Sequence, residues 1–456
     1  MMTNPLYLPE LREMLAAGDK EGLREFCEAV HPAAVAEFME GLSPAESWAV
    51  LQHTDEATRT EIFSFFEPTK QVEMIETLDR EEMAELIGEL PPDDRVDILK
   101  ESDSGVVAEL MPLVPADERR DILRLGSYPE ETAGAIMTTE FARVRETATV
   151  QQALDEIAGQ AGQLETIYYL YAVDESDHLR GVLSARQLLS AIGKPDRSVG
   201  EIMERHVISV DGDDDQEEVA DKVARYDLLA IPVVDAEHRL LGIITYDDVL
   251  DVMREEAVED AQRLGAVDPL EDSYLDTPFY TLAWKRGMWL TILFVGALLT
   301  ALALQHYHVE LDQWEWLVLF IPLVISSGGN SGSQSATLII SALSAGHVSL
   351  GDSLKIVRRE LLQGLVLGGF LGLIGFVAAY ALRGDAGDAL VIPATILLVV
   401  MAGTLCGAVL PLVFERLGQD PALMSTPFIA GIIDVLGIMI YMTVALALLT
   451  PPALSG

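Results

Sequence analysis

One carboxylate lies in the middle of the last long apolar segment, where its chemistry would suit ion transport. Asp434 stands within the sequence TPFIAGIIDVLGIMIY, in which it is the only charged residue. A charged group inside a membrane is costly unless it meets a cation or water, and the interiors of the apolar segments hold no basic residue to pair with it. Asp434 is therefore predicted to contact a permeating cation or a proton, and a structural hydrogen bond is the alternative.

A second apolar segment carries a polar centre. Residues 323–340 read LVISSGGNSGSQSATLII. Polar groups that lack partners in hydrocarbon cost several kcal/mol each, so this centre must face protein or water. Asn330 and Gln334 lie one helical turn apart and point the same way, while Gly328 and Gly329 allow helices to approach closely or to break. We predict that these four residues line an ion path; close packing through small residues is the alternative.

Five apolar segments are long enough to place these residues in a membrane, because each is close to or above the ~20 residues that a spanning helix requires. They cover residues 288–305, 317–344, 361–382, 389–414 and 427–449. Basic residues precede the first segment and follow the second and fourth, at Lys285, Arg286, Lys355, Arg358, Arg359 and Arg416. The positive-inside rule then predicts five spans in the cell (inner) membrane, with a cytoplasmic N-terminal part and the C-terminal PPALSG outside.

The charge of the chain is concentrated ahead of these spans. The formal net charge is -43 over 456 residues, yet only 10 of the 73 acidic residues lie from Lys285 onward, together with 7 of the 30 basic ones. Nucleic acid is excluded as a partner, since a phosphate backbone requires a basic face. Cations are the expected partners, and a salt-adapted surface is the other explanation of the total charge.

Other classes of protein are disfavoured by missing motifs. The two cysteines, Cys27 and Cys406, provide neither a disulfide framework nor a cysteine-rich metal site, which favours a reducing compartment for the soluble part. The first residues lack the basic start and apolar run of a secretory signal. A P-loop, a nucleophile elbow and an HExxH motif are all missing, so we do not expect an enzyme.

The soluble part begins with short amphipathic helices over residues 1–132. Turn signals recur as SPAES from Ser43, EPTKQ from Glu67, PPDDR from Pro91 and VPADE from Val114. Proline in a first helical turn, with acidic residues beside it, is typical of a helix start. The pattern predicts an acidic α-helical superhelix of stacked hairpins.

An internal repeat follows at 133–198 and 199–252. The starts AGAIMTTEFARV and VGEIMERHVISV correspond, as do YLYAVDESDHLRGVLSARQLL and LAIPVVDAEHRLLGIITYDDVL. Each copy reads as strand, helix, strand, turn, strand, helix, and this pattern resembles the CBS domain, an α/β module that works in pairs and often binds adenine nucleotides. The resemblance implies that Thr245 contacts phosphate and Asp248 the ribose hydroxyls of ATP or another adenine nucleotide. In the first copy Gln187 stands where the acid would be.

A CBS pair ahead of five spans resembles the MgtE family of magnesium channels over essentially the whole chain. Further matching stretches are YPEETAG at 128–134, EEAVED at 255–260, the GGN cluster after Pro322, and TPFIAGIIDVLG at 426–437. The resemblance implies a multi-domain protein with an all-α superhelical N-terminal domain, an α/β CBS pair and an α-helical membrane domain. It also implies a homodimeric Mg2+-permeable channel that closes when its cytoplasmic domains bind Mg2+. The sequence does not discriminate Mg2+ from Mn2+ or Co2+.

The acidic clusters suit such a role, because Mg2+ is a hard cation that prefers oxygen ligands and keeps much of its water. They lie in the helical domain, in the second CBS copy and in a connecting, plug-like segment over 253–284 before the channel domain at 285–456. Residues to which the resemblance assigns Mg2+ binding are Asp93, Asp97, Asp215, Glu217, Asp227, Asp248, Asp251, Glu256 and Glu259. Without counterions these faces repel, and Mg2+ should draw them together.

Two other functions fit parts of the pattern. A secondary transporter would use Asp434 as a proton or sodium carrier and would need the corresponding gradient. A membrane-anchored nucleotide sensor would use the spans only as an anchor, which leaves Asp434 and the polar segment unexplained.

Overall fold

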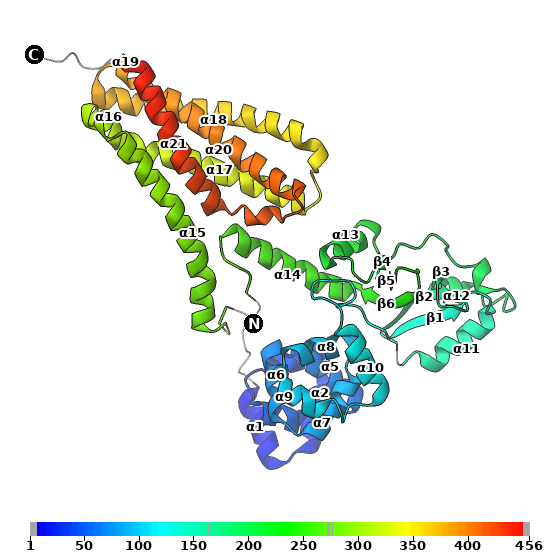
Figure 1. The fold of residues 1–456 in the computed structure, drawn as a ribbon. Helices are drawn as coiled ribbons and strands as arrows, with labels where there is room; N and C mark the ends of the chain where they lie inside the picture. The colour runs from blue at the N-terminus through cyan, green and yellow to red at the C-terminus, as the bar shows by residue number, and fades with distance from the viewer. Residues whose placement is uncertain (1–6, 163, 271–273, 276, 450–456) are drawn as a thin grey trace, which may run out of the picture. The chain divides into compact units, whose positions relative to one another are not determined.

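The computed structural model describes residues 7–162, 164–270, 274–275 and 277–449. It divides into two compact units, Met1–Arg254 and Glu255–Gly456, each of which is described by itself (Figure 1). The C-terminal PPALSG, which the sequence places outside, lies beyond the described residues.

The first unit opens with ten short helices. They are α1 (Leu8–Ala17), α2 (Lys20–Ala29), α3 (Pro32–Met39), α4 (Pro44–Leu51), α5 (Glu56–Ser64), α6 (Pro68–Thr77), α7 (Arg80–Glu89), α8 (Pro92–Glu101), α9 (Ser104–Leu110) and α10 (Ala116–Leu125). Proline begins α4, α6 and α8, as the turn signals predicted, and Ser43 forms a capping box with Glu46 ahead of α4.

These helices stack in a regular way. From α3 onward each helix packs on the second one after it, α3 on α5, α4 on α6, and so on to α8 on α10. The apolar faces, for example Leu51, Met74 and Ile87, are fully buried between them. The predicted helical N-terminal domain is confirmed.

The two repeats form two three-stranded sheets. The first contains β1 (Phe141–Arg145), α11 (Val150–Gln160), β2 (Thr166–Val173), β3 (Leu179–Ser184) and α12 (Ala185–Ser190). The second contains β4 (Val210–Asp211), α13 (Gln216–Tyr226), β5 (Ala230–Val234), β6 (Leu240–Thr245) and α14 (Tyr246–Leu264), after the short η1 (Val199–Glu201). Both copies follow the predicted order of strand, helix, strand, strand and helix. In both sheets the first strand is parallel to the second and the second antiparallel to the third.

The leading segment of each copy pairs with a strand of the other copy. The Thr138 amide, ahead of β1 in the first copy, donates to the Ile243 carbonyl oxygen of β6 at 2.8 Å. The Val182 amide of β3 donates to the carbonyl oxygen of Glu204, in the second copy, at 2.9 Å. A Cβ at Gly242 would lie 2.6 Å from the Thr138 carbonyl oxygen, so the strand can approach only because this residue is glycine. The repeat therefore folds as one paired module.

The second unit is built from long apolar helices. They are α15 (Phe279–His306), α17 (Ile321–Ser344), α18 (Ser353–Arg383), α20 (Val391–Arg416) and α21 (Thr426–Leu448), joined by α16 (His308–Gln313), η2 (Glu315–Phe320), η3 (Leu350–Asp352), α19 (Ala386–Ala389) and η4 (Pro421–Leu423). Within the described residues, four helices are long and apolar enough to cross a membrane: α15, α18, α20 and α21. The fifth predicted span, α17, is a continuous helix of 24 residues whose polar centre keeps it outside this set.

Glycines bring α17 and α20 together at their centres. Gly328 and Gly332 of α17 are buried against Gly403 and Gly407 of α20. A Cβ added at Gly403 or Gly407 would collide with the carbonyl oxygen of Gly328 or Gly332. Small residues at such spacing let helix backbones approach closely in a membrane. The helix does not break at its glycines, so the packing alternative is the one that this structure adopts for Gly328.

We expect Gly403→Val to disrupt this contact. The added side chain meets backbone atoms, which cannot move aside as a flexible side chain would, so overpacking should cost about 1 to 3 kcal/mol or more. The measurement is the melting temperature of the full chain in detergent. Gly369→Val is the matched control, since nothing lies within 4 Å of a Cβ at Gly369; equal melting temperatures for the two variants would contradict the packing argument.

Candidate ion pathway and acidic clusters

Asp434 lies on α21 where this helix packs against α17. A Cβ at Gly329 would lie 3.9 Å from Asp434 Oδ1, so the absence of a side chain at Gly329 leaves space beside the carboxylate. Asp434 is half-buried, and within the described part of the chain it has neither a hydrogen-bond partner nor an ion-pair partner. A carboxylate that is inside the membrane unit and lacks a protein partner is available to a cation or to water.

The amides of α17 do not face the glycine contact. Asn330 and Gln334 are exposed in the single chain, and Asn330 Nδ2 donates to Ser326 Oγ at 3.2 Å. Gly328, in contrast, is buried beside Val399 of α20. Gly328 thus contributes to helix packing, and a path lined by Gly328, Gly329, Asn330, Gln334 and Asp434 stays a prediction.

A second carboxylate in the membrane unit is missing from the sequence predictions. Glu360 of α18 is only 5% exposed, and Ser335 Oγ of α17 donates to its Oε2 at 2.6 Å. Thr404 Oγ1 of α20 donates to the Glu360 carbonyl oxygen at 3.2 Å, so one residue links three helices. Sequence reasoning did not single out Glu360 because it stands at the edge of an apolar segment beside Arg358 and Arg359, where it reads as part of a polar loop.

In the first unit, acidic residues of the helical domain lie beside those of the CBS pair. Asp93 and Asp94 are in the first turn of α8, and Asp247 and Asp248 are in the first turn of α14. Asp93 is 9% exposed, and its Oδ1 has no hydrogen-bond partner among the described residues. We call these four residues and Glu165 the cytosolic acidic cluster.

Burial and mutual repulsion raise the pKa values in this cluster. Burial, assisted by Asp247 and Asp251, raises the pKa of Asp94 to about 6. Burial also raises the pKa of Asp248 to about 6 and that of Glu165 to about 7, and the pKa of Asp93 lies well above its usual range for the same reason. Ionisation of the cluster is therefore unfavourable in the folded protein unless a cation is present.

The other predicted metal ligands of the first unit have more local surroundings. Asp251 is exposed and pairs with Arg254 at 3.3 Å. Asp215 caps α13 by accepting from the Glu217 amide at 2.8 Å, and Asp227 ends the same helix in a left-handed conformation with φ 52°. Their position at helix ends explains these acids without an ion, so Mg2+ binding by Asp215, Glu217 and Asp227 stays a prediction.

Asp97 lies one helical turn after Asp93 and Asp94 on α8, and its side chain is exposed. Asp97 has interactions of its own within the first unit. It remains a predicted ligand beside the cytosolic acidic cluster.

Thr245 and Asp248, the predicted nucleotide contacts, are bonded to one another. Thr245 Oγ1 contacts both Asp248 Oδ2 and Asp247 Oδ1, the latter at 2.6 Å, and the Thr245 amide donates to Asp248 at 3.2 Å. This arrangement begins α14 in the manner of an N-cap. A nucleotide at this position would have to replace part of it.

The second half of α14 contacts the membrane unit. Ser344 Oγ, at the end of α17, donates to Asp260 at 3.2 Å, and Thr426 Oγ1 donates to the Leu264 carbonyl oxygen at 3.2 Å. Arg263 pairs with both Glu259 and Asp420. The helix predicted to connect sensor and membrane is thus attached to the ends of α17 and α21; Glu256 and Glu259 lie on this half of it and are partly exposed.

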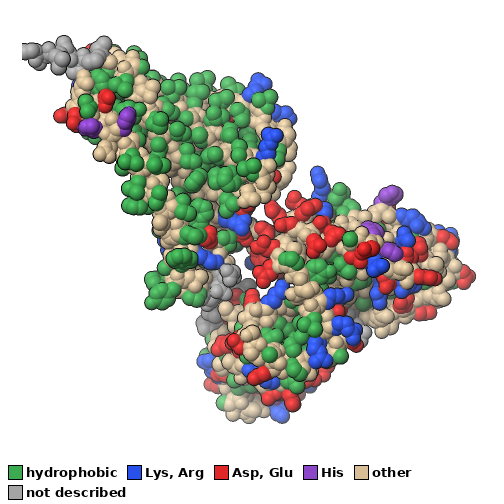
Figure 2. All heavy atoms as spheres, viewed as in Figure 1, with side chains coloured by type: hydrophobic (Ala, Val, Ile, Leu, Met, Phe, Trp, Pro, Cys, Tyr) green, Lys and Arg blue, Asp and Glu red, His purple; other side chains and the backbone are tan. Residues whose placement is uncertain are grey.

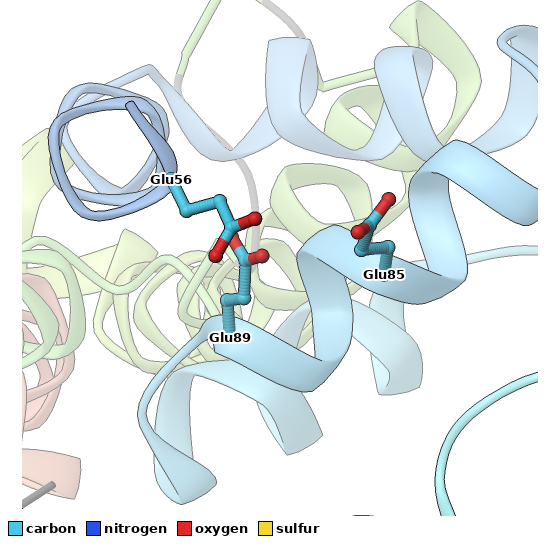
Figure 3. Close-up of side chains that lie close together, drawn as sticks. All are labelled: Glu56, Glu85 and Glu89. Carbon is cyan, nitrogen blue, oxygen red and sulfur yellow. The ribbon is translucent and has the colours of Figure 1, made fainter. Parts of the chain in front are cut away.

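Three further carboxylates converge within the helical domain. Oxygens of Glu56 of α5 and of Glu85 and Glu89 of α7 all lie within 4.8 Å of one another, and Figure 3 shows Glu56 and Glu89 pointing toward each other. Thr60 Oγ1 donates to Glu89 at 2.9 Å, and burial raises the pKa of Glu89. Only the pairing of neighbouring helices brings these residues together, so sequence spacing gave no signal for them.

The two units differ in the side chains that cover their surfaces. Figure 2 shows apolar side chains covering the long helices of the second unit, whereas acidic side chains crowd the first unit and the neighbouring part of α14. An apolar helical unit with a carboxylate that has no partner among the described residues, preceded by an acidic module, is typical of a membrane transport protein.

Comparison with known proteins identifies the family. The family model described as a divalent cation transporter, MgtE, matches residues 321–444, the MgtE intracellular N domain matches 30–131, and CBS domains match 133–194 and 199–255. The magnesium transporter MgtE of Thermus thermophilus is 38% identical over 445 residues, covering 96% of this chain and 98% of that protein. The chain belongs to the MgtE family of divalent cation transporters; it is a membrane transporter with a cytosolic N-terminal part, not an enzyme.

Further relatives agree with this assignment. The magnesium transporter MgtE of Enterococcus faecalis is 34% identical over 319 residues, covering 70% of this chain and 69% of that protein. A crystal structure of the soluble part of a magnesium transporter matches with 34% identity and a TM-score of 0.51, covering 55% of this chain and 97% of the other. The cytosolic domain of the Mg2+ channel MgtE in complex with ATP matches with 40% identity and a TM-score of 0.50, covering 53% of this chain and 98% of the other.

We expect the stability of the first unit to depend on pH when divalent cations are removed. The folded-state pKa values of Asp94 and Asp248 are about 6, above their usual range near 4, so folding favours the protonated forms. Below about pH 4, each protonated carboxylate stabilises the folded protein by on the order of 2 kcal/mol. This stabilisation is lost as the pH rises through about 6.

The test is the melting temperature of the full chain in chelator between pH 5 and pH 8. It should fall for the wild type and fall less for Asp94→Asn. Asp196→Asn, which removes an exposed acid from a loop, serves as the control and should follow the wild type. A wild-type melting temperature that is constant or rises over this range would contradict the argument.

Proposed function

We propose that the chain is a Mg2+-selective channel that imports the ion and closes when Mg2+ binds to its cytosolic acidic residues. The single observation that supports it most is the carboxylate of Asp434, which lies in the membrane unit beside Gly329 without a protein partner. Both relatives named above are magnesium transporters. Mn2+ and Co2+ have similar size and charge and are secondary candidates for permeation.

The chain acts as a homodimer in this proposal. One Asp434 makes a poor filter, but a two-fold axis near α17 and α21 would bring two carboxylates together, and rings of acids select cations. The helix α15 supports a partner subunit, since none of its 28 residues is buried within the single chain. The exposed amides of Asn330 and Gln334 would then face the same path.

The path suits a hydrated ion. Mg2+ loses its water reluctantly and is commonly held by one or two carboxylates through its hydration shell. Asp434, Asn330 and Gln334 offer oxygen atoms for outer-shell contacts, and glycine at 329 places no side chain against Asp434, whose Oδ1 lies 3.9 Å from that Cβ position.

The membrane topology follows from the same reasoning. We place α17 as a fifth span, because its polar centre packs on α20 and faces the path rather than lipid. Five spans and a cytosolic N-terminal part put the C-terminus outside the cell membrane.

Gating in this proposal rests on the cytosolic acidic cluster. Without Mg2+ the carboxylates of α8 and α14 repel, and an ion bound between Asp93 and Asp248 removes the repulsion and favours a closed state. Closure from mostly open requires about 5.5 kcal/mol of differential binding, which several sites can supply together. Asp97, Asp251, Glu256 and Glu259 extend the acidic surface along α8 and α14, and α14 carries the change to its contacts with Ser344 and Thr426.

ATP or another adenine nucleotide is a further proposed ligand. The relative of known structure that binds ATP is 40% identical to this chain. We place the nucleotide at Thr245 and Asp248 of the second CBS copy, where binding would compete with the Thr245 contacts that begin α14.

We expect Asp434→Asn to abolish Mg2+ flux. The variant keeps the shape of the side chain and removes the charge, so a loss of at least about 100-fold should accompany an unchanged melting temperature. The measurement is Mg2+ uptake into proteoliposomes with equal proton and sodium concentrations on both sides. Asp388→Asn is the control, since Asp388 is an acid of the same unit that pairs with Arg383 at 2.7 Å away from the path.

Two outcomes would overturn parts of this proposal. Wild-type flux that requires a proton or sodium gradient would replace the channel by a secondary transporter. Flux through Asp434→Asn equal to that of the wild type would remove this residue from the pathway.

We expect Asp93→Asn combined with Asp248→Asn to weaken control by Mg2+. The charge of Asp248 contributes to the raised pKa of Asp93, and we place one ion between the two carboxylates. Without them, the ratio of fluxes at low and at millimolar cytosolic Mg2+ should fall about tenfold toward one. The same vesicles measure both fluxes, and Asp196→Asn is the control that should keep the wild-type ratio. A double variant with the wild-type ratio would show that closure does not use these carboxylates.

A further inference from the structure

One face of α18 combines cations with apolar side chains. Residues at spacings of three and four line a hollow of about 710 Å3: Lys355, Arg358, Arg359, Leu362, Gln363, Val366 and Leu367. Such spacing places them on a single stripe of the helix, with the charges at its first turns and the apolar residues after them. The stripe therefore passes from charged to apolar along one helix.

Two of these cations are not neutralised by the protein. Lys355 Nζ contacts Asp352 at 2.7 Å, but Arg358 and Arg359 are exposed and have no acidic partner among the described residues. The adjacent Glu360 is turned inward, where it accepts the hydrogen bond from Ser335 of α17. In a chain with a net charge of -43, this unpaired positive pair is available to an anionic ligand.

A second hollow continues along α18. It has a volume of about 420 Å3 and is apolar, with Gly369 and Gly372 on one side and Pro393, Ala394 and Leu397 of α20 on the other. Nothing lies within 4 Å of a Cβ at Gly369. At 1.5 Å per residue, Gly369 lies about 16 Å along the helix from Arg358, close to half the thickness of the hydrocarbon core.

The charged end of the stripe lies on the cytosolic side. Ser344, at the end of α17, contacts Asp260 of α14, the helix that follows the cytosolic module, and α18 begins at Ser353 after a short connection. Figure 2 shows basic side chains gathered at the end of the apolar helices that carries this connection. The cytoplasmic leaflet is the one in which anionic lipids attract basic residues next to the membrane.

We propose that this face of α18 binds an anionic phospholipid. Arg358 and Arg359 hold the phosphate of the headgroup, Gln363 donates a hydrogen bond beside it, and one acyl chain runs past Leu362 and Val366 into the hollow at Gly369. The two unpaired arginines suit an anionic headgroup, and the distance from Arg358 to the hollow at Gly369 suits the depth of the hydrocarbon core. Both features favour this lipid as the occupant. The site is remote from Asp434 and does not depend on which ion is transported.

The test is native mass spectrometry of the full chain in detergent, titrated with phosphatidylglycerol or with phosphatidylcholine of the same acyl chains. Wild type should bind the first phosphatidylglycerol about tenfold more tightly than phosphatidylcholine. Arg358→Gln with Arg359→Gln should lose this preference. The matched control is Lys285→Gln with Arg286→Gln, which removes the same charge from α15 at residues that line neither hollow, and should keep the preference.

A second variant addresses the acyl chain. An added Cβ at Gly369 meets no atom within 4 Å, so the side chain of Gly369→Leu can enter the apolar hollow. It should weaken phosphatidylglycerol binding several-fold, while the melting temperature should equal that of the wild type. It also tests the site if the double arginine variant does not fold.

Three results would overturn the proposal. The double arginine variant could keep the wild-type preference, which would leave these cations a role only in orienting the chain. Soluble glycerol phosphate could displace the lipid at equal concentration, which would assign the site to a free phosphate compound. Substitution of the arginines could change the number of subunits and not the number of lipids, which would assign the face to a second copy of the chain.

Discussion

The structure of the membrane unit depends on keeping the polar centre of α17 away from lipid. Its glycines do so on one side by packing Gly328 and Gly332 against Gly403 and Gly407, so the backbone is covered by another backbone. Its amides, on the other side, require water or a partner, and Asp434 on α21 has the same requirement. The channel that we propose between two copies of the chain would meet both needs, and it would link the packing of one helix to the transport of an ion.

The cytosolic unit, which lies in water, also contains polar groups that require a partner. Carboxylates of α8 and α14 lie close together and are partly buried. Their pKa values are raised, because burial and the neighbouring negative charges make ionisation unfavourable. A divalent cation offsets that cost better than a proton at neutral pH, because it can satisfy several carboxylates at once. The helix α14 begins in this cluster, and its second half contacts α17 and α21. In the proposed function this helix carries a change in ion concentration to the pore.

Local signals in the sequence predicted most of the fold. Proline and acidic residues after Ser43, Glu67 and Pro91 identified helix starts, and the repeated alternation from Ala133 identified the paired sheets. Contacts between distant segments were not predictable from spacing: Glu360 meets Ser335, and Glu56 meets Glu89, only after helices pack. Asp434 could be recognised from sequence because a lone charge in an apolar run is conspicuous, whereas the role of Gly328 in packing required its neighbour on α20.

In the proposed function Mg2+ passes by itself, without a coupled ion, and the reversal potential of the current distinguishes this from coupled transport. The full chain in a planar bilayer should carry current when Mg2+ differs tenfold across the membrane and proton and sodium concentrations are equal. We expect a reversal potential of about 30 mV with the sign of the Mg2+ gradient, the value for a divalent ion. A reversal potential that follows an imposed proton or sodium gradient would contradict it.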